Sequence, residues 1–148
     1  MSVRRLLIVL SLTVFTVALI LLLTGSKWLL ISLSDTSNIP LGTFITWMGL
    51  ISLPAIIFLG INRLYYPKNA VDKLFKKLII LALIIAVLWV PVSYLLAGNI
   101  SFTFGEKVSF QGGQTAMKWF WIFTYTIPGL SLFVFLLFGI VSAFRRKE

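Results

Sequence analysis

The sequence predicts an all-α integral membrane protein, a four-transmembrane-helix bundle with a small extracytoplasmic β-hairpin or two- to three-stranded sheet. The 148-residue chain is 59% hydrophobic and 11% charged, whereas soluble domains are about 45–50% apolar and about 25% charged. Four long stretches contain no charged residue, and basic residues gather beside them. Lipid is the solvent that such an excess of apolar surface requires.

A transmembrane helix needs about 20 largely apolar residues to cross roughly 30 Å of hydrocarbon. Four stretches meet this requirement, at about 6–23, 43–61, 78–97 and 119–144. Their apolar character is unbroken, which favours helices over the alternating strands of a barrel. Residues 1–148 are therefore expected to form a single polytopic membrane domain. Its connections would be outer loops at about 24–42 and 98–118 and a cytoplasmic loop at about 62–77.

The first span has a second interpretation as a signal peptide, because Arg4 and Arg5 make a basic beginning. Its apolar run is longer than the usual signal-peptide core of about 7–15 residues. Residues 23–27 also lack the small-residue pattern of a cleavage site. We therefore expect this span to be retained.

Basic residues predict the orientation of the chain. Of 13 lysines and arginines, ten lie before span one, between spans two and three, or after span four. The other three are Lys27, Lys107 and Lys118. The positive-inside rule then places both termini in the cytoplasm. Together with the absence of cysteine, this bias favours a bacterial inner (cytoplasmic) membrane as the location.

The connection between spans two and three predicts a short amphipathic helix. Pro67 ends the preceding helix, and Asn69 is a typical N-cap that places Asp72 near the positive helix end. Apolar residues recur at helical spacing from position 71 to 78. Three lysines, Lys73, Lys76 and Lys77, lie on other faces and are candidate contacts for anionic lipid. The alternative, which we favour, is that they only anchor the topology.

The second outer loop has the pattern of a β-hairpin. Residues 100–104 and 108–111 alternate apolar and polar side chains around a turn at 105–107. Its apolar face would carry Phe102, Phe104 and Phe110, a candidate outer contact surface. Residues 29–34 are a candidate third strand, because a lone hairpin is marginal in water.

The composition excludes much chemistry. The chain has no cysteine and no histidine, so it lacks the thiolate nucleophile and the commonest metal ligand and general base. No ionisable side chain except tyrosine lies within a span, which argues against a proton-coupled transporter. Asp35 and Glu106 would be the carboxylate pair of an enzyme, but both have ordinary turn surroundings. We expect no catalytic residue, cofactor, metal or nucleic-acid partner.

Small residues predict where helices approach closely. They form a stripe on span three and a patch on span four, which are candidate helix-packing or partner faces. The residues are Ala82, Ala86, Ser93, Ala97, Gly139 and Ala143. Pro54, Pro91 and Pro128 each remove a backbone donor within a span and predict kinks.

These features favour a protein that works through protein–protein contacts in the bilayer, with lipids and either another membrane protein or a second copy as partners. It would be an accessory subunit of a membrane complex or an immunity-type protein against a pore-forming toxin. The alternative is a small pore or transport component without ion-coupling residues, although no selectivity-filter pattern is present.

Overall fold

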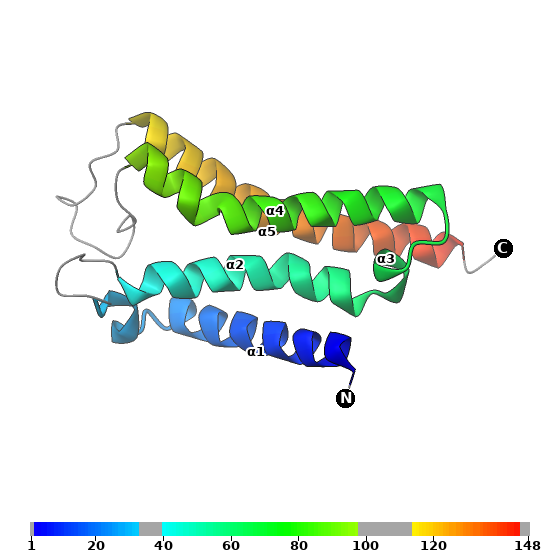
Figure 1. Cartoon of the computed structure of the whole chain (residues 1–148), viewed down its shortest axis with the longest axis horizontal. Helices are drawn as coiled ribbons and strands as arrows, with labels where there is room; N and C mark the ends of the chain where they lie inside the picture. The colour runs from blue at the N-terminus through cyan, green and yellow to red at the C-terminus, as the bar shows by residue number, and fades with distance from the viewer. Residues whose placement is uncertain (1, 33–39, 98–113, 146–148) are drawn as a thin grey trace.

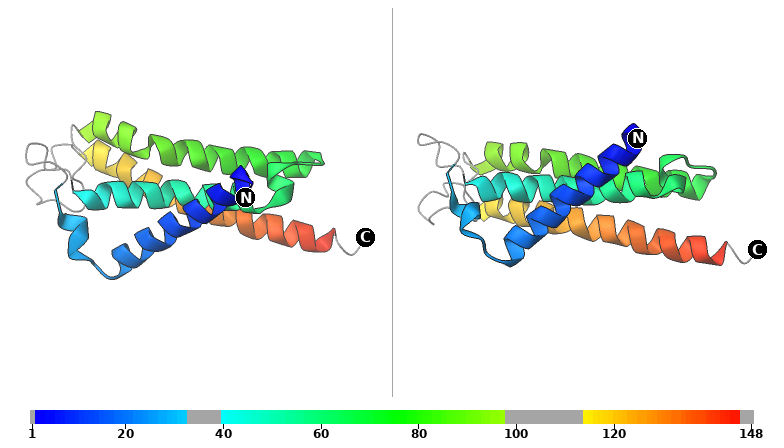
Figure 2. Two further views of the ribbon diagram at one scale, coloured as in Figure 1. Left: turned by 60° about the horizontal axis from the view of Figure 1, so that its bottom comes forward. Right: turned by 90° about the horizontal axis from the view of Figure 1, so that it is seen from below.

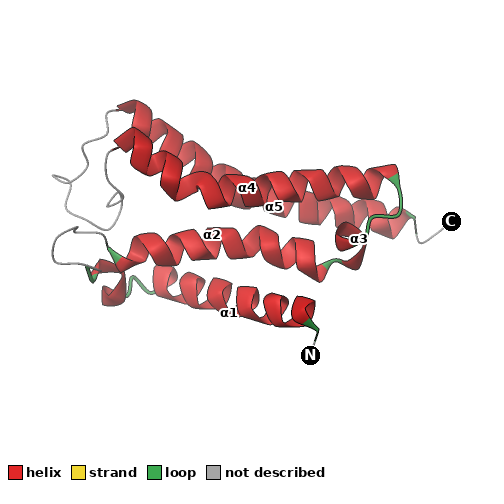
Figure 3. Cartoon of the chain, in the orientation of Figure 1, coloured by secondary structure: helices red, strands yellow, loops and turns green. Residues whose placement is uncertain are grey.

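The computed structural model describes residues 2–32, 40–97 and 114–145, and this part of the chain is all-helical, without a strand (Figure 3). Four of its helices are long and apolar enough to cross a bilayer, which confirms the predicted number and type of spans. In chain order the elements are α1 (Val3–Leu23), the 3-10 helix η1 (Lys27–Leu30), α2 (Leu41–Gly60), α3 (Asn62–Tyr65), α4 (Ala70–Ala97) and α5 (Gln114–Phe144).

The chain alternates direction from one long helix to the next. The beginning of α1, the short helix α3 and the end of α5 therefore lie at the same end of the molecule (Figure 1). We call this end the basic end, because eight of the ten basic residues in the described part of the chain lie there. The opposite end is called the far end.

Helix α4 is longer than the uncharged stretch that predicted it. It begins at Ala70, after Asn69, whose side-chain oxygen accepts the backbone N–H of Asp72 at 2.9 Å. This bond confirms Asn69 as the N-cap. The predicted amphipathic segment forms the first turns of α4 and continues directly into the span, because lysine is a good helix former and does not interrupt it.

The expected third strand at residues 29–34 is wrong at its start, because Leu29 and Leu30 belong to η1. Helix α1 ends with a Schellman motif at Gly25 (φ 57°), and the Ser26 hydroxyl then accepts the Trp28 N–H at 3.4 Å. These local bonds turn the backbone where a strand would extend it. An isolated antiparallel bridge between Ser32 and Pro40 follows.

The hairpin itself lies outside the described residues, and so do Phe102, Phe104 and Phe110. The described part of the chain offers no strand in its support.

The four long helices do not contribute equally to one bundle. Helices α2, α4 and α5 pack against each other, whereas α1 packs along α2 and η1 and reaches α3 through the Arg4 side chain. Figure 2 shows α1 crossing the other helices diagonally on one side. The molecule is therefore a three-helix core with one peripheral helix.

Two apolar clusters fill the core. The cluster nearer the basic end comprises Ile57, Leu64, Phe75, Ile79, Val134 and Phe138. The cluster nearer the far end comprises Ala86, Trp89, Val90, Phe120 and Ile127. Both draw on α2, α4 and α5 or their immediate connections, and α1 supplies no residue to either.

The three prolines that predict kinks all lie inside helices: Pro54 in α2, Pro91 in α4 and Pro128 in α5. Each removes one backbone hydrogen bond from its helix. Figure 1 shows α4 and α5 changing direction part-way along their length.

Candidate functional site

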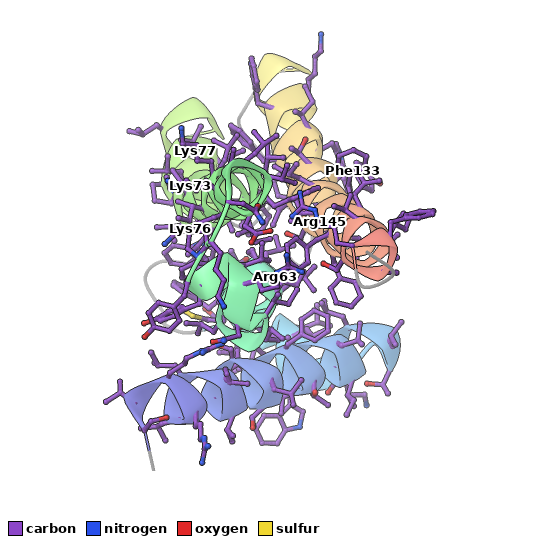
Figure 4. All side chains as sticks on the ribbon, turned by 90° about the vertical axis from the view of Figure 1, so that its right-hand side faces the viewer. Arg63, Lys73, Lys76, Lys77, Phe133 and Arg145 are labelled. Carbon is purple, nitrogen blue, oxygen red and sulfur yellow. The ribbon has the colours of Figure 1, made fainter. Side chains whose placement is uncertain are left out.

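A buried carboxylate organises the basic end. The Asp72 side chain is 1% exposed and lies 3.5 Å from the Nε of Arg63 and 3.4 Å from an Nη of Arg145. The backbone N–H of Lys68 also donates to it, at 3.4 Å. Figure 4 shows Arg63 and Arg145 in the middle of this end of the molecule. One side chain thus ties together α3, α4 and α5.

This ion cluster is structural in character. A buried carboxylate must be paired, and two guanidinium groups from different helices meet that need. The sequence indicated only that Asp72 stands near a helix start, and it did not reveal the two partners. The available signal was that Asp72 is the single acid within the basic connection 62–77.

The three predicted lipid-contacting lysines do not share one environment. Lys76 is half-buried, and its Nζ donates to the Tyr65 carbonyl at 3.3 Å and lies 5.7 Å from the Phe58 ring. Lys73 and Lys77 are exposed. The three side chains lie along α4, away from the two arginines (Figure 4). Lys76 alone of the three lines an open groove of about 660 Å³ beside α3.

The predicted small-residue stripe of α4 lies inside the molecule. Ala82 and Ala86 are fully buried and Ser93 is 2% exposed, so this face packs against the core and is not available to a partner. The surroundings of the Ala97 side chain are outside the described part of the structure. Gly139 and Ala143 of α5 are exposed, and no atom approaches the position that a side chain at Gly139 would take.

A close helix crossing that the small-residue stripe did not predict lies between α1 and α2. Ala18 is the buried residue of α1. A Cβ atom placed on Gly49 would lie 2.9 Å from the Ala18 Cβ, so the two backbones approach as closely as a glycine allows. Sequence reasoning missed this contact, although Gly42 and Gly49 are seven residues apart on α2 and share a helix face.

Beside this crossing runs an apolar groove of about 280 Å³, which we call the α1–α2 groove. It is lined by Thr13, Val14, Val17, Ala18, Phe44, Ile45 and Met48. Its one hydroxyl, on Thr13, donates to the Val9 carbonyl of its own helix at 2.9 Å. The groove therefore presents almost no unsatisfied polar group.

Polar side chains between the core helices serve packing. The indole N–H of Trp47 donates to the Ala86 carbonyl at 2.9 Å, and that of Trp89 donates to the Thr124 hydroxyl at 3.0 Å. The hydroxyls of Thr124 and Ser131 donate to carbonyls of their own helix. These bonds tie α2 to α4 and α4 to α5.

Asp35 and Glu106, the carboxylates considered for an enzyme, lie outside the described residues. Within residues 2–32, 40–97 and 114–145, no three potential metal ligands lie together. Comparison of the chain with protein-family models, curated proteins and solved structures found no match.

Proposed function

We propose that the protein acts without catalysis, by binding another membrane protein within the bilayer. The observation that supports this most directly is the peripheral position of α1, which adds a helix to one side of α2 and borders the α1–α2 groove. An accessory subunit of a membrane complex and an immunity-type protein against a pore-forming toxin both fit this proposal.

The partner we propose is a transmembrane helix. Lipid tails are as apolar as leucine, so helices associate in a bilayer through close packing and not through hydrophobicity. The α1–α2 groove is lined by side chains that range from Ala18 to Phe44 on two helices, which gives a concave surface for the side chains of a third. Its apolar lining needs no polar partner.

We place the basic end in the cytoplasm of a bacterial cell and the far end outside the inner membrane. The excess of basic residues at that end supports this orientation. Reporter fusions at Asn38 and Gly112 are then expected to face the compartment opposite to Lys147. In this arrangement a hairpin carrying Phe102, Phe104 and Phe110 would offer a second contact surface outside the membrane.

Photo-crosslinking in native membranes tests the proposal. A photoreactive residue at Val17 or Met48 samples the α1–α2 groove, and one at Leu81 or Ile84 samples the exposed side of α4 as a matched apolar control. We expect a protein adduct of discrete size from the groove positions and none from the control positions. Equal adducts from all four positions would contradict a specific partner site. A homo-oligomer that conducts ions in liposomes would support the alternative of a small pore.

A further inference from the structure

We propose that the groove beside α3 binds the headgroup of an anionic phospholipid from the adjoining leaflet. This site is separate from the α1–α2 groove and requires only that the protein sits in a bilayer, whatever its protein partner. We call it the α3 groove. It is lined by Phe58, Tyr65, Tyr66, Pro67, Lys68 and Lys76.

The first argument is the combination of side chains. Phe58, Tyr65 and Tyr66 are aromatic, and tyrosine rings settle at the level of lipid headgroups. Their T-shaped and tilted contacts, Tyr65 with Tyr66 and Phe58 with Tyr65, build a continuous aromatic wall. The wall suits the glycerol region of a lipid, and the lysines suit its phosphate.

The second argument is that Lys76 is already held in place. Its Nζ donates one hydrogen bond to the Tyr65 carbonyl and lies over the Phe58 ring. An ammonium group has three N–H donors, so two remain for a ligand. A side chain already fixed in this way loses less conformational entropy when it binds.

The third argument is charge. Asp72 is the one acidic residue in the described part of the chain, and Arg63 and Arg145 both pair with it. No described carboxylate therefore pairs with Lys68 or Lys76. Arg4, whose guanidinium lies 4.7 Å from the centre of the Tyr65 ring, adds a further positive charge beside that ring. An anion is the complementary ligand.

The occupant is a phospholipid and not a soluble anion because of where the groove lies. Phe58 belongs to the last turn of the apolar helix α2, and Lys76 lies within the first two turns of α4. The groove therefore spans the boundary between the apolar part of the molecule and its charged end. A phospholipid can contact the apolar part with its acyl chains and the charged end with its phosphate.

Two pairs of substitutions separate a site from general attraction. The variant Lys68→Gln/Lys76→Gln removes two charges from the α3 groove, and Lys73→Gln/Lys77→Gln removes the same number from the exposed side of α4. The full-length protein is placed in nanodiscs that mix phosphatidylglycerol with phosphatidylcholine. The lipids that remain bound after transfer to detergent are measured by native mass spectrometry.

We expect the unsubstituted protein to retain phosphatidylglycerol over phosphatidylcholine. In the variant Lys68→Gln/Lys76→Gln, that preference should fall about fivefold for each lysine removed. In Lys73→Gln/Lys77→Gln, it should fall less than about twofold. Lys76→Arg, which keeps the charge, should retain most of the preference, and thermal unfolding of each variant checks its fold. Equal losses from both pairs, no loss from either, or displacement of the lipid by free glycerol phosphate would overturn the proposal.

Discussion

Helix α1 and the three-helix core differ in a way that hydrophobicity does not explain. Over its most apolar 18 residues, α1 has the highest mean hydropathy of the four long helices, 3.0, and α2 has the lowest, 1.8. Yet only 6% of the α1 span is buried, against 33% of the α2 span. The span with the highest mean hydropathy is therefore the one with the smallest buried share.

The physical reason is that a bilayer offers leucine no gain on burial against another helix. What holds membrane helices together is close backbone approach and interhelical polar contact. The core has both, in buried Ala82 and Ala86 and in the bonds of Trp47 and Trp89. Helix α1 has the Ala18–Gly49 crossing and the Arg4 side chain at its first turn.

The largest expected effect comes from removing the partners of the buried acid in the core. Arg63→Ala/Arg145→Ala leaves Asp72 buried without a cation, which should cost about 3–5 kcal/mol of unfolding free energy in detergent. Adding Asp72→Asn should restore most of that loss, because the buried charge is then gone. A double variant as stable as the parent, or a triple variant no better than the double, would show that the ion cluster does not hold the core.

The second largest effect is expected from a substitution that separates α1 from the core. Gly49→Val should push α1 away from α2 at a cost of about 1–3 kcal/mol, because the new side chain has no space beside Ala18. Cross-linking between cysteines introduced at Val17 and Met48 measures the α1–α2 contact, and the parent chain has no cysteine to interfere.

A size swap provides the control for that substitution. Gly49→Ala should weaken the same cross-link, and Gly49→Ala with Ala18→Gly should recover it, since the swap returns the lost space. If the swap gave no recovery, the close crossing would not be what positions α1.

A smaller effect is expected where α1 meets the basic end. Arg4 donates to the Leu59 carbonyl and to the Asn62 side chain, each at 2.8 Å, and lies over the Tyr65 ring. Arg4→Ala should therefore weaken the packing of α1 against the rest of the protein by about 1 kcal/mol. Hydrogen exchange of the first α1 turns measures this, with Arg5→Ala, at an exposed neighbour, as the matched control. Equal hydrogen-exchange rates in the two variants would show that the Arg4 side chain does not hold α1 in place.

The smallest effect is expected within the core. Thr124→Val removes the acceptor of the Trp89 indole N–H, and interhelical bonds of this kind average about 0.6 kcal/mol in membranes. Detergent unfolding should shift by about that amount while the α1–α2 cross-link stays unchanged. A loss of the α1–α2 cross-link in this variant would show that the attachment of α1 depends on the packing of the core.

The four spans could be predicted from the sequence because a long apolar stretch without charged residues rarely forms anything other than a transmembrane helix. It placed the helix starts late, since charges mark the edge of hydrocarbon and not the end of a helix. Lys73 and Lys77 lie within α4, although they lie before the predicted span.

The sequence pattern could not predict which helices are neighbours, because any pairing of four transmembrane helices satisfies the backbone. The small residues were informative in part: Ala82 and Ala86 do pack inside, whereas Gly139 and Ala143 face outward. The pairing of Asp72 with Arg145 joins positions 73 residues apart, a separation at which spacing carries no information.

Distance measurements between spin labels in nanodiscs test most directly the claim that α1 is a peripheral helix on a three-helix core. Label pairs would join α1 to α2, α1 to α5, and α2 to α4, each with and without Gly49→Val. We expect Gly49→Val to lengthen and broaden the α1–α2 and α1–α5 distances while the α2–α4 distance keeps its width and position. A change in all three distances, or in none, would contradict the account.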